Sequence, residues 1–174
     1  MKFAYADPPY LGCGRLYAKL HPEAMIWDDP ETHRRLIQRL QDEYPLGWVL
    51  SCSTPSLRVL LPMSPADCRI GAWVKPFAVY KPNVNPAYAW EPVIWRGGRK
   101  RGRTDPTCRD WHSENITLRK GVPGAKPPKF TMWVADLLGV NFAVDTIDDL
   151  FPGTRSMARV WAERIEPQQF EIVC

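Results

Sequence analysis

The sequence has no long apolar run, no paired cysteines and no clustered histidines. No run in the 174 residues approaches the roughly 20 apolar residues that a membrane-spanning helix needs, and residues 1–7 lack the apolar stretch of a signal peptide. The five cysteines are odd in number and form no Cys-x-x-Cys pair, which argues against a disulfide framework and a zinc site. We therefore expect a cytoplasmic protein that has no membrane segment and binds no metal.

Composition and charge are those of an ordinary globular chain. Hydrophobic residues make up 45% of the sequence, and 174 residues is the usual size of one domain. The net charge of +4 is unevenly distributed, because residues 96–103 hold five cations: Arg96, Arg99, Lys100, Arg101 and Arg103. A flexible basic segment of this kind suits DNA phosphate contacts. Charge alone fits a solvated surface loop equally well.

Hydrophobic periodicity predicts strands that alternate with helices. Strands are expected at residues 2–6, 48–52, 69–74, 89–95, 144–151 and 170–173. Helices are expected after the capping residue Asp29, at 53–61, from Pro128 to the terminating Gly139, and at 156–165. The pattern predicts an α/β sandwich with a largely parallel sheet, in which 89–95 is an antiparallel hairpin strand. Residues 11–29 and 96–125 show no period, and we interpret them as loops.

Two turns follow predicted strands, and both contain residues that could bind a ligand or take part in a reaction. Asp7-Pro8-Pro9-Tyr10 comes directly after the first strand, and Phe151-Pro152-Gly153-Thr154 comes at the end of the strand at 144–151. Ligands of open α/β sheets bind beside the carboxyl ends of strands. The sequence therefore places both turns where a ligand site is expected.

These motifs resemble those of S-adenosylmethionine-dependent amino-methyltransferases. Asp7-Pro8-Pro9-Tyr10 matches the catalytic motif of that family, and residues 148–154 look like its cofactor-binding strand and glycine turn. Lys126-Pro127-Pro128 is similar to the lysine-proline motif upstream of that strand, and residues 73–76 and 90–95 are similar to segments of the same sheet. The motif order resembles the circularly permuted arrangement of beta-class and Asp-Pro-Pro-Trp adenine methyltransferases. Small phage-encoded methylases look similar, which would place the protein in host cytoplasm.

The resemblance implies a single Rossmann-like methyltransferase domain over residues 1–174 that methylates the N6 amine of an extruded adenine in DNA. The adenine amine is a poor nucleophile because its lone pair is delocalised into the ring. In the family, the Asp7 carboxylate and the Pro8 carbonyl accept the two amine hydrogens, Pro9 helps to fix the turn, and Tyr10 stacks on the base. The resemblance also implies residues that contact S-adenosylmethionine: Lys126, Pro127, Asp149, Phe151, Gly153, Thr154, Arg155 and Glu171.

Arg155 occupies the second glycine position of the usual Phe-x-Gly-x-Gly turn, and Glu171 is the candidate for the cofactor ribose. Because no separate recognition domain is visible, we expect substrate contacts from residues 11–29 and 96–120, with Trp27 near the flipped base. Two alternatives stay open. One is a catalytically inactive methyltransferase fold that binds nucleic acid or protein. The other is methylation of cytosine N4 or of RNA adenine. The sequence does not indicate an oligomeric state.

Overall fold

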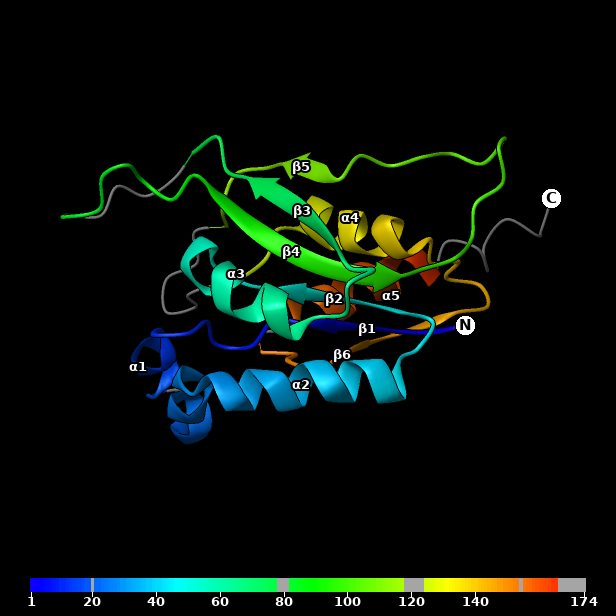
Figure 1. Cartoon of the computed structure of the whole chain (residues 1–174). Coiled ribbons are helices and arrows are strands. Elements are labelled where there is room, and N and C mark those ends of the chain that lie inside the picture. Colours follow the sequence, from blue (N-terminus) through cyan, green and yellow to red (C-terminus); the bar gives the residue numbers. More distant parts are fainter. Residues whose placement is uncertain (20, 78–81, 118–123, 154, 166–174) are drawn as a thin grey trace.

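The computed structural model describes residues 1–19, 21–77, 82–117, 124–153 and 155–165, and in them a six-stranded sheet forms the centre of the molecule (Figure 1). The strand order is β5-β3-β4-β2-β1-β6. The strands are β1 (Lys2–Ala6), β2 (Gly47–Ser51), β3 (Arg69–Val74), β4 (Trp90–Gly97), β5 (Trp111–Ser113) and β6 (Thr146–Asp149). The strand predicted at 170–173 lies outside the described residues.

The sheet is largely parallel, as the sequence predicts. β1 pairs in parallel with both β2 and β6, and β3 pairs in parallel with β5. β4 runs antiparallel between β2 and β3, which confirms the predicted hairpin partner. The architecture is α/β and compatible with a Rossmann-like fold.

Helices cover both faces of the sheet (Figure 1). They are α1 (Gly14–Tyr17), α2 (Pro30–Glu43), α3 (Thr54–Leu60), α4 (Pro128–Leu138) and α5 (Ser156–Ile165). Alternate residues of a strand point to opposite faces. Accordingly, Phe3 and Tyr5 of β1 belong to a core with α4 and α5, whereas Ala4 and Ala6 belong to a core with α2 and α3.

Local signals in the sequence explain where the helices begin and end. The side chain of Asp29 accepts the backbone N–H of Glu31 at the start of α2, and Ser53 caps α3 in the same way through the N–H of Ser56. At the end of α4, Gly139 takes the left-handed conformation with φ of 63°, which glycine adopts without steric cost. The helices predicted from these signals are confirmed.

The loop prediction for residues 11–29 was wrong. This segment contains α1 and a 3-10 helix at Pro22–Asp28, and the N–H of Gly14 donates to the Asp28 carboxylate at 2.9 Å. β5 was likewise missed within residues 96–125. These elements are too short for a hydrophobic period, and contacts with the rest of the fold stabilise them. Among the described residues, no helix has both the length and the apolar character needed to cross a bilayer.

Candidate active site

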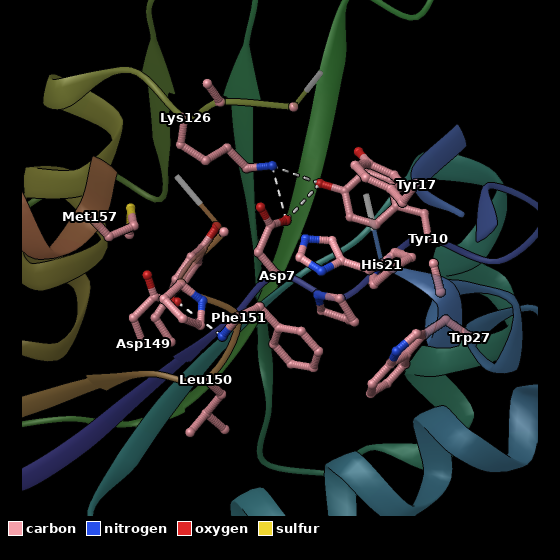
Figure 2. Close-up of a pocket in the computed structure, with 18 of the residues that line it drawn as sticks. Asp7, Tyr10, Tyr17, His21, Trp27, Lys126, Asp149, Leu150, Phe151 and Met157 are labelled. Atoms are coloured by element: carbon pink, nitrogen blue, oxygen red, sulfur yellow. Dashed lines mark hydrogen bonds and ion pairs between the residues drawn. The ribbon is translucent and has the colours of Figure 1, made fainter. Parts of the chain in front are cut away.

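A pocket of about 720 Å³ opens at the carboxyl ends of the adjacent parallel strands β1 and β6 (Figure 2). The turns that follow these two strands therefore lie side by side. The pocket brings together many of the residues that the sequence analysis assigned to catalysis, cofactor and base: Asp7, Pro8, Pro9, Tyr10, Trp27, Lys126, Asp149, Phe151, Gly153 and Arg155. Thr154 and Glu171 lie outside the described residues, and Pro127 is the N-cap of α4.

Asp7 and Lys126 form an ion pair inside this pocket. The Lys126 ammonium donates to Oδ1 of Asp7 at 2.9 Å, and the two side chains are only 6% and 21% exposed. Burial raises the pKa of Asp7, and the Lys126 charge offsets part of that effect. Burial alone would lower the pKa of Lys126, but the charges of Asp7 and Glu91 outweigh it and raise that pKa. Lys126 is therefore a permanent cation beside the catalytic motif.

Tyr10 connects Asp7 to a second carboxylate, that of Glu91. The Tyr10 hydroxyl lies 2.9 Å from Oε2 of Glu91 and 3.2 Å from Oδ1 of Asp7, and it accepts a hydrogen bond from Lys126 at 3.0 Å. Lys75 donates to Oε1 of Glu91 at 3.0 Å. We call these five residues (Asp7, Tyr10, Lys75, Glu91 and Lys126) the charge network. Its two carboxylates are matched by its two ammonium groups.

Sequence reasoning assigned no function to Lys75 or Glu91. Both charges lie within or beside apolar strand segments, Trp73-Val74-Lys75 and Trp90-Glu91-Pro92, and charged residues are rarely buried unless they are paired. A charged residue within an apolar strand segment was therefore the sequence feature that could have identified Lys75 and Glu91. The pairing of Trp73 with Glu91 across β3 and β4 then brings Lys75 to the Glu91 carboxylate.

Two acceptors of the Asp7-Pro8-Pro9-Tyr10 turn have no hydrogen-bond donor in the described part of the chain. Oδ1 of Asp7 is held by Lys126 and Tyr10. In contrast, no donor among the described residues bonds Oδ2 of Asp7 or the carbonyl oxygen of Pro8. Both residues line the pocket. The motif therefore presents two neighbouring acceptors, which is what a primary amine with two hydrogens requires.

Asp149 places another carboxylate in the pocket, at the end of β6. One of its oxygens accepts the backbone N–H of Phe151 at 3.1 Å. Burial raises the pKa of Asp149 to about 6, the Phe151 N–H opposes this shift and the Asp7 charge adds to it. No cation among the described residues pairs with this carboxylate. It is a partly buried acid with no counter-ion in the described ranges, so a cationic ligand would stabilise its ionised form.

The turn after β6 keeps the backbone conformation expected of a glycine turn even where glycine is missing. Gly153 has φ of 42° and Arg155 has φ of 57°. Positive φ is rare for a residue with a Cβ, and it costs glycine nothing. The exposed Arg155 therefore adopts a conformation that glycine would tolerate more easily, at a cost in backbone strain.

The segment at residues 11–29 forms the wall of the pocket opposite this turn. The Trp27 ring makes edge contacts with Phe151 (centroids 5.0 Å apart) and His33 (5.3 Å), and the Trp27 carbonyl bonds Nε2 of His33 at 2.9 Å. Trp27 thus connects this segment to the turn after β6. Tyr17 and His21 also line the pocket (Figure 2), and sequence reasoning had overlooked both because this segment has no period.

The structure does not bring the basic residues 96–103 to the pocket. β4 is antiparallel, so its end at Gly97 pairs with the start of β2 at Gly47, at the opposite edge of the sheet (Figure 1). Three of the cations have local partners there. Arg96 pairs with Asp67, Arg99 with Asp145 and the Gly139 carbonyl, and Arg101 with the carbonyls of Pro106 and Asp136. Lys100 and Arg103 are exposed, and their contact with DNA stays a prediction.

Neither the protein-family models nor the curated proteins include a match to this chain. Within the described residues, no group of three or more histidine, cysteine, aspartate or glutamate side chains is arranged to hold a metal ion. A functional interpretation therefore depends on the residues and geometry of the pocket.

Proposed function

We propose that this protein transfers a methyl group from S-adenosylmethionine to the N6 amine of adenine in DNA, as a circularly permuted member of the amino-methyltransferases. The observation that carries the proposal is the shared pocket of β1 and β6. It is lined by Asp7 and Pro8, whose Oδ2 and carbonyl oxygen bond no donor among the described residues, and by Asp149, whose carboxylate pairs with no cation among them. The two acceptors suit an amine, and the Asp149 carboxylate suits a cationic cofactor.

The residues of the pocket fit S-adenosylmethionine. Its sulfonium and amino groups are cations, and Asp149 is a carboxylate that lacks one. Arg155 lines the same pocket and suits the cofactor carboxylate, and Phe151 offers a ring for apolar contact. The cavity volume lies within the range of roughly 300–1,000 Å³ that is common for small-molecule sites. When bound, the cofactor would supply an electrophilic methyl group.

The chain's own contribution is to orient the amine and accept its proton. Asp7 Oδ2 and the Pro8 carbonyl would each accept one N–H hydrogen, so that the nitrogen can pyramidalise and direct its lone pair toward the methyl group. After methylation the nitrogen carries a positive charge and must lose one proton. Asp7 is placed to take it, and burial raises its pKa. An adenine in a duplex must first be flipped out of the stack, and Tyr17 and His21 give the pocket rings beside which it could lie.

The test is transfer of labelled methyl groups to unmethylated DNA by wild type and by Asp7→Asn. The substitution keeps the shape of the side chain and removes the ionised acceptor, so we expect a loss in rate of about 100-fold or more. Asp148→Asn is the matched control, because Asp148 lies on β6, the strand beside β1, but bonds Tyr44 and Lys2. Equal rates for wild type and Asp7→Asn would exclude this role of Asp7. Nucleoside analysis of the product separates adenine N6 from cytosine N4, and a parallel RNA substrate tests the RNA alternative.

A second candidate function is a methyltransferase fold that binds nucleic acid or protein without catalysis. The observation that favours it is Arg155, a large side chain at a turn position where the backbone has φ of 57°. Calorimetry with S-adenosylmethionine distinguishes the two candidates. Measurable heat of binding supports the enzyme, whereas absence of binding together with retained DNA affinity supports the binding module.

A further inference from the structure

Glu91 has a place in the charge network that the proposed roles of Asp7 and Pro8 do not explain. It belongs to β4, and its side chain is 23% exposed. One carboxylate oxygen, Oε1, accepts from Lys75 at 3.0 Å, and the other, Oε2, faces the Tyr10 hydroxyl at 2.9 Å. Lys126 lies a further 3.7 Å from Oε2. The fold thus holds the Glu91 carboxylate against Tyr10.

The Tyr10 hydroxyl has one hydrogen, and two carboxylates lie within reach to accept it. Its oxygen already accepts a hydrogen bond from Lys126, which directs its own hydrogen toward a carboxylate. Glu91 at 2.9 Å is closer than Asp7 at 3.2 Å, and hydroxyl hydrogen bonds strengthen as they shorten toward about 2.7 Å. When the hydrogen goes to Glu91, Asp7 keeps a single charged donor, Lys126.

We propose that Glu91 is a positioning residue that acts through Tyr10. By taking the Tyr10 hydrogen, it keeps the Asp7 carboxylate free to accept the hydrogens, and then the proton, of the substrate amine. This inference rests on the proposed function. Lys75 completes this arrangement of hydrogen bonds, because its ammonium compensates the Glu91 charge and holds Oε1 away from Tyr10.

The electrostatics of the two carboxylates support this division of roles. Burial opposes ionisation of Glu91, but the charges of Lys126 and Lys75 outweigh burial and lower its pKa. Glu91 is therefore an ionised acceptor near neutral pH. Its charge in turn contributes to the raised pKa of Asp7.

A titration of Asp7 also senses the groups around it. The groups that face it are the phenols of Tyr5, Tyr10 and Tyr17, the Cys52 thiol, the carboxylates of Glu91 and Asp149, and the Lys126 ammonium. The phenol and thiol pKa values are all raised, so those groups stay neutral while Asp7 titrates. The pKa of Asp149 is also raised, and its charge acts on Asp7, so Asp149→Asn is included in every NMR sample to remove this second titration.

The test is the pKa of Asp7, measured by NMR on protein with ¹³C-labelled aspartate, with Asp7→Asn used to assign the signal. In Glu91→Gln the like charge is gone and the Tyr10 hydroxyl turns to Asp7, so we expect the Asp7 pKa to fall by about one unit. In Tyr10→Phe the relay is absent, and Glu91→Gln added to it should shift Asp7 by less than half as much. The acid limb of kcat/KM should move in parallel with the Asp7 pKa.

Controls separate this relay from charge alone and from unfolding. Glu114→Gln removes a carboxylate of similar burial, whose partners are His112 and the N–H of Phe130, and should leave the Asp7 pKa unchanged. Glu91→Asp should restore part of the shift. If Glu91→Gln does not fold, Lys75→Met with Glu91→Gln removes both charges and gives a neutral substitute.

Two results would overturn the inference. The first is an unchanged Asp7 pKa in Glu91→Gln, and the second is an equal shift with and without the Tyr10 hydroxyl, which would show action through space only. The titration needs neither cofactor nor DNA. A wild-type protein that transfers no methyl group would therefore end the proposed function and leave the link from Glu91 to Asp7 separately tested.

Discussion

The Lys126 ammonium lies 2.9 Å from Oδ1 of Asp7, although 119 positions separate the two residues. The contact joins the turn after β1 to the segment that leads into α4. Because the pair is almost enclosed, neither charge is well solvated without the other. The Asp7-Pro8-Pro9-Tyr10 turn therefore reaches its final geometry only when the two distant segments meet.

Removing the cation of this pair should destabilise the protein. Lys126→Met leaves Asp7 as a buried carboxylate without a counter-ion, and we expect a loss of about 3 kcal/mol in the free energy of unfolding near neutral pH. The loss should shrink as the pH falls and Asp7 takes up a proton. Urea unfolding of the variant from pH 4 to 8 measures this, and adding Asp7→Asn should restore most of the stability. A pH-independent loss would show that packing, not charge, is responsible.

Asp149 should make stability depend on pH. Its pKa is about 6 in the folded protein against an ordinary value of 3.8, so between these values the folded state binds more protons than the unfolded state. The free energy of unfolding must then fall as the pH rises through this interval. Asp149→Asn removes the effect while its side-chain oxygen still accepts the Phe151 N–H. Relative to wild type, the variant should be similar below pH 4 and more stable above pH 6, by about 1–2 kcal/mol after solvent screening.

The same carboxylate predicts how ligand affinity changes with pH. If a cationic cofactor pairs with Asp149, binding should strengthen as the pH rises through about 6, because the ionised form is the one that binds. Calorimetry in buffers of different ionisation enthalpy measures the protons released. Affinity that is flat from pH 5 to 7.5 would place the cofactor cation elsewhere.

Relief of the strain at Arg155 should stabilise the protein. Its φ of 57° costs a residue with a Cβ about 1 kcal/mol or more relative to glycine. Arg155→Gly should therefore raise the free energy of unfolding by about 0.5–1 kcal/mol, after the greater entropy of glycine in the unfolded chain. Arg155→Ala removes the same guanidinium and keeps the strain, so it isolates the backbone effect. Thermal unfolding of all three proteins decides between them.

The basic segment should matter for stability in a residue-specific way. Arg99 donates to the Gly139 carbonyl at the end of α4 and to Asp145, whereas its neighbour Lys100 is exposed. Arg99→Ala should lower the free energy of unfolding by about 1 kcal/mol, and Lys100→Ala should change it by less than about 0.5 kcal/mol. Denaturant titration of both variants tests the contrast. Equal effects would mean that the net charge of the segment, and not the contacts of Arg99, determines its contribution.

Sequence alone predicted the elements that have long periods or clear caps. The start of α2 at Asp29, the end of α4 at Gly139 and the strands β1, β2, β3, β4 and β6 follow from side chains that act locally. β5 was missed because it has three residues, and its hydrogen bonds to β3 define it rather than any pattern of its own.

The residues of the candidate site likewise fall into those that sequence predicted and those that it did not. The Asp7-Pro8-Pro9-Tyr10 turn and the β6 turn are contiguous motifs, and sequence was enough to find them. Glu91 and Lys75 join the charge network through strand register, and Tyr17 and His21 line the pocket from a segment of short helices without a period. Register and tertiary contact are properties of the assembled sheet, so the residues they contribute are not visible along the chain.

The antiparallel course of β4 separates two parts of the molecule that are close in sequence. Glu91 stands at the start of β4 beside the pocket, and Gly97 stands at the other end, where residues 100–105 are exposed to solvent. Almost the whole length of β4 separates Glu91 from Gly97. An affinity tag or a surface linkage inserted near Thr104 would thus attach the protein at the end of β4 that lies away from the charge network.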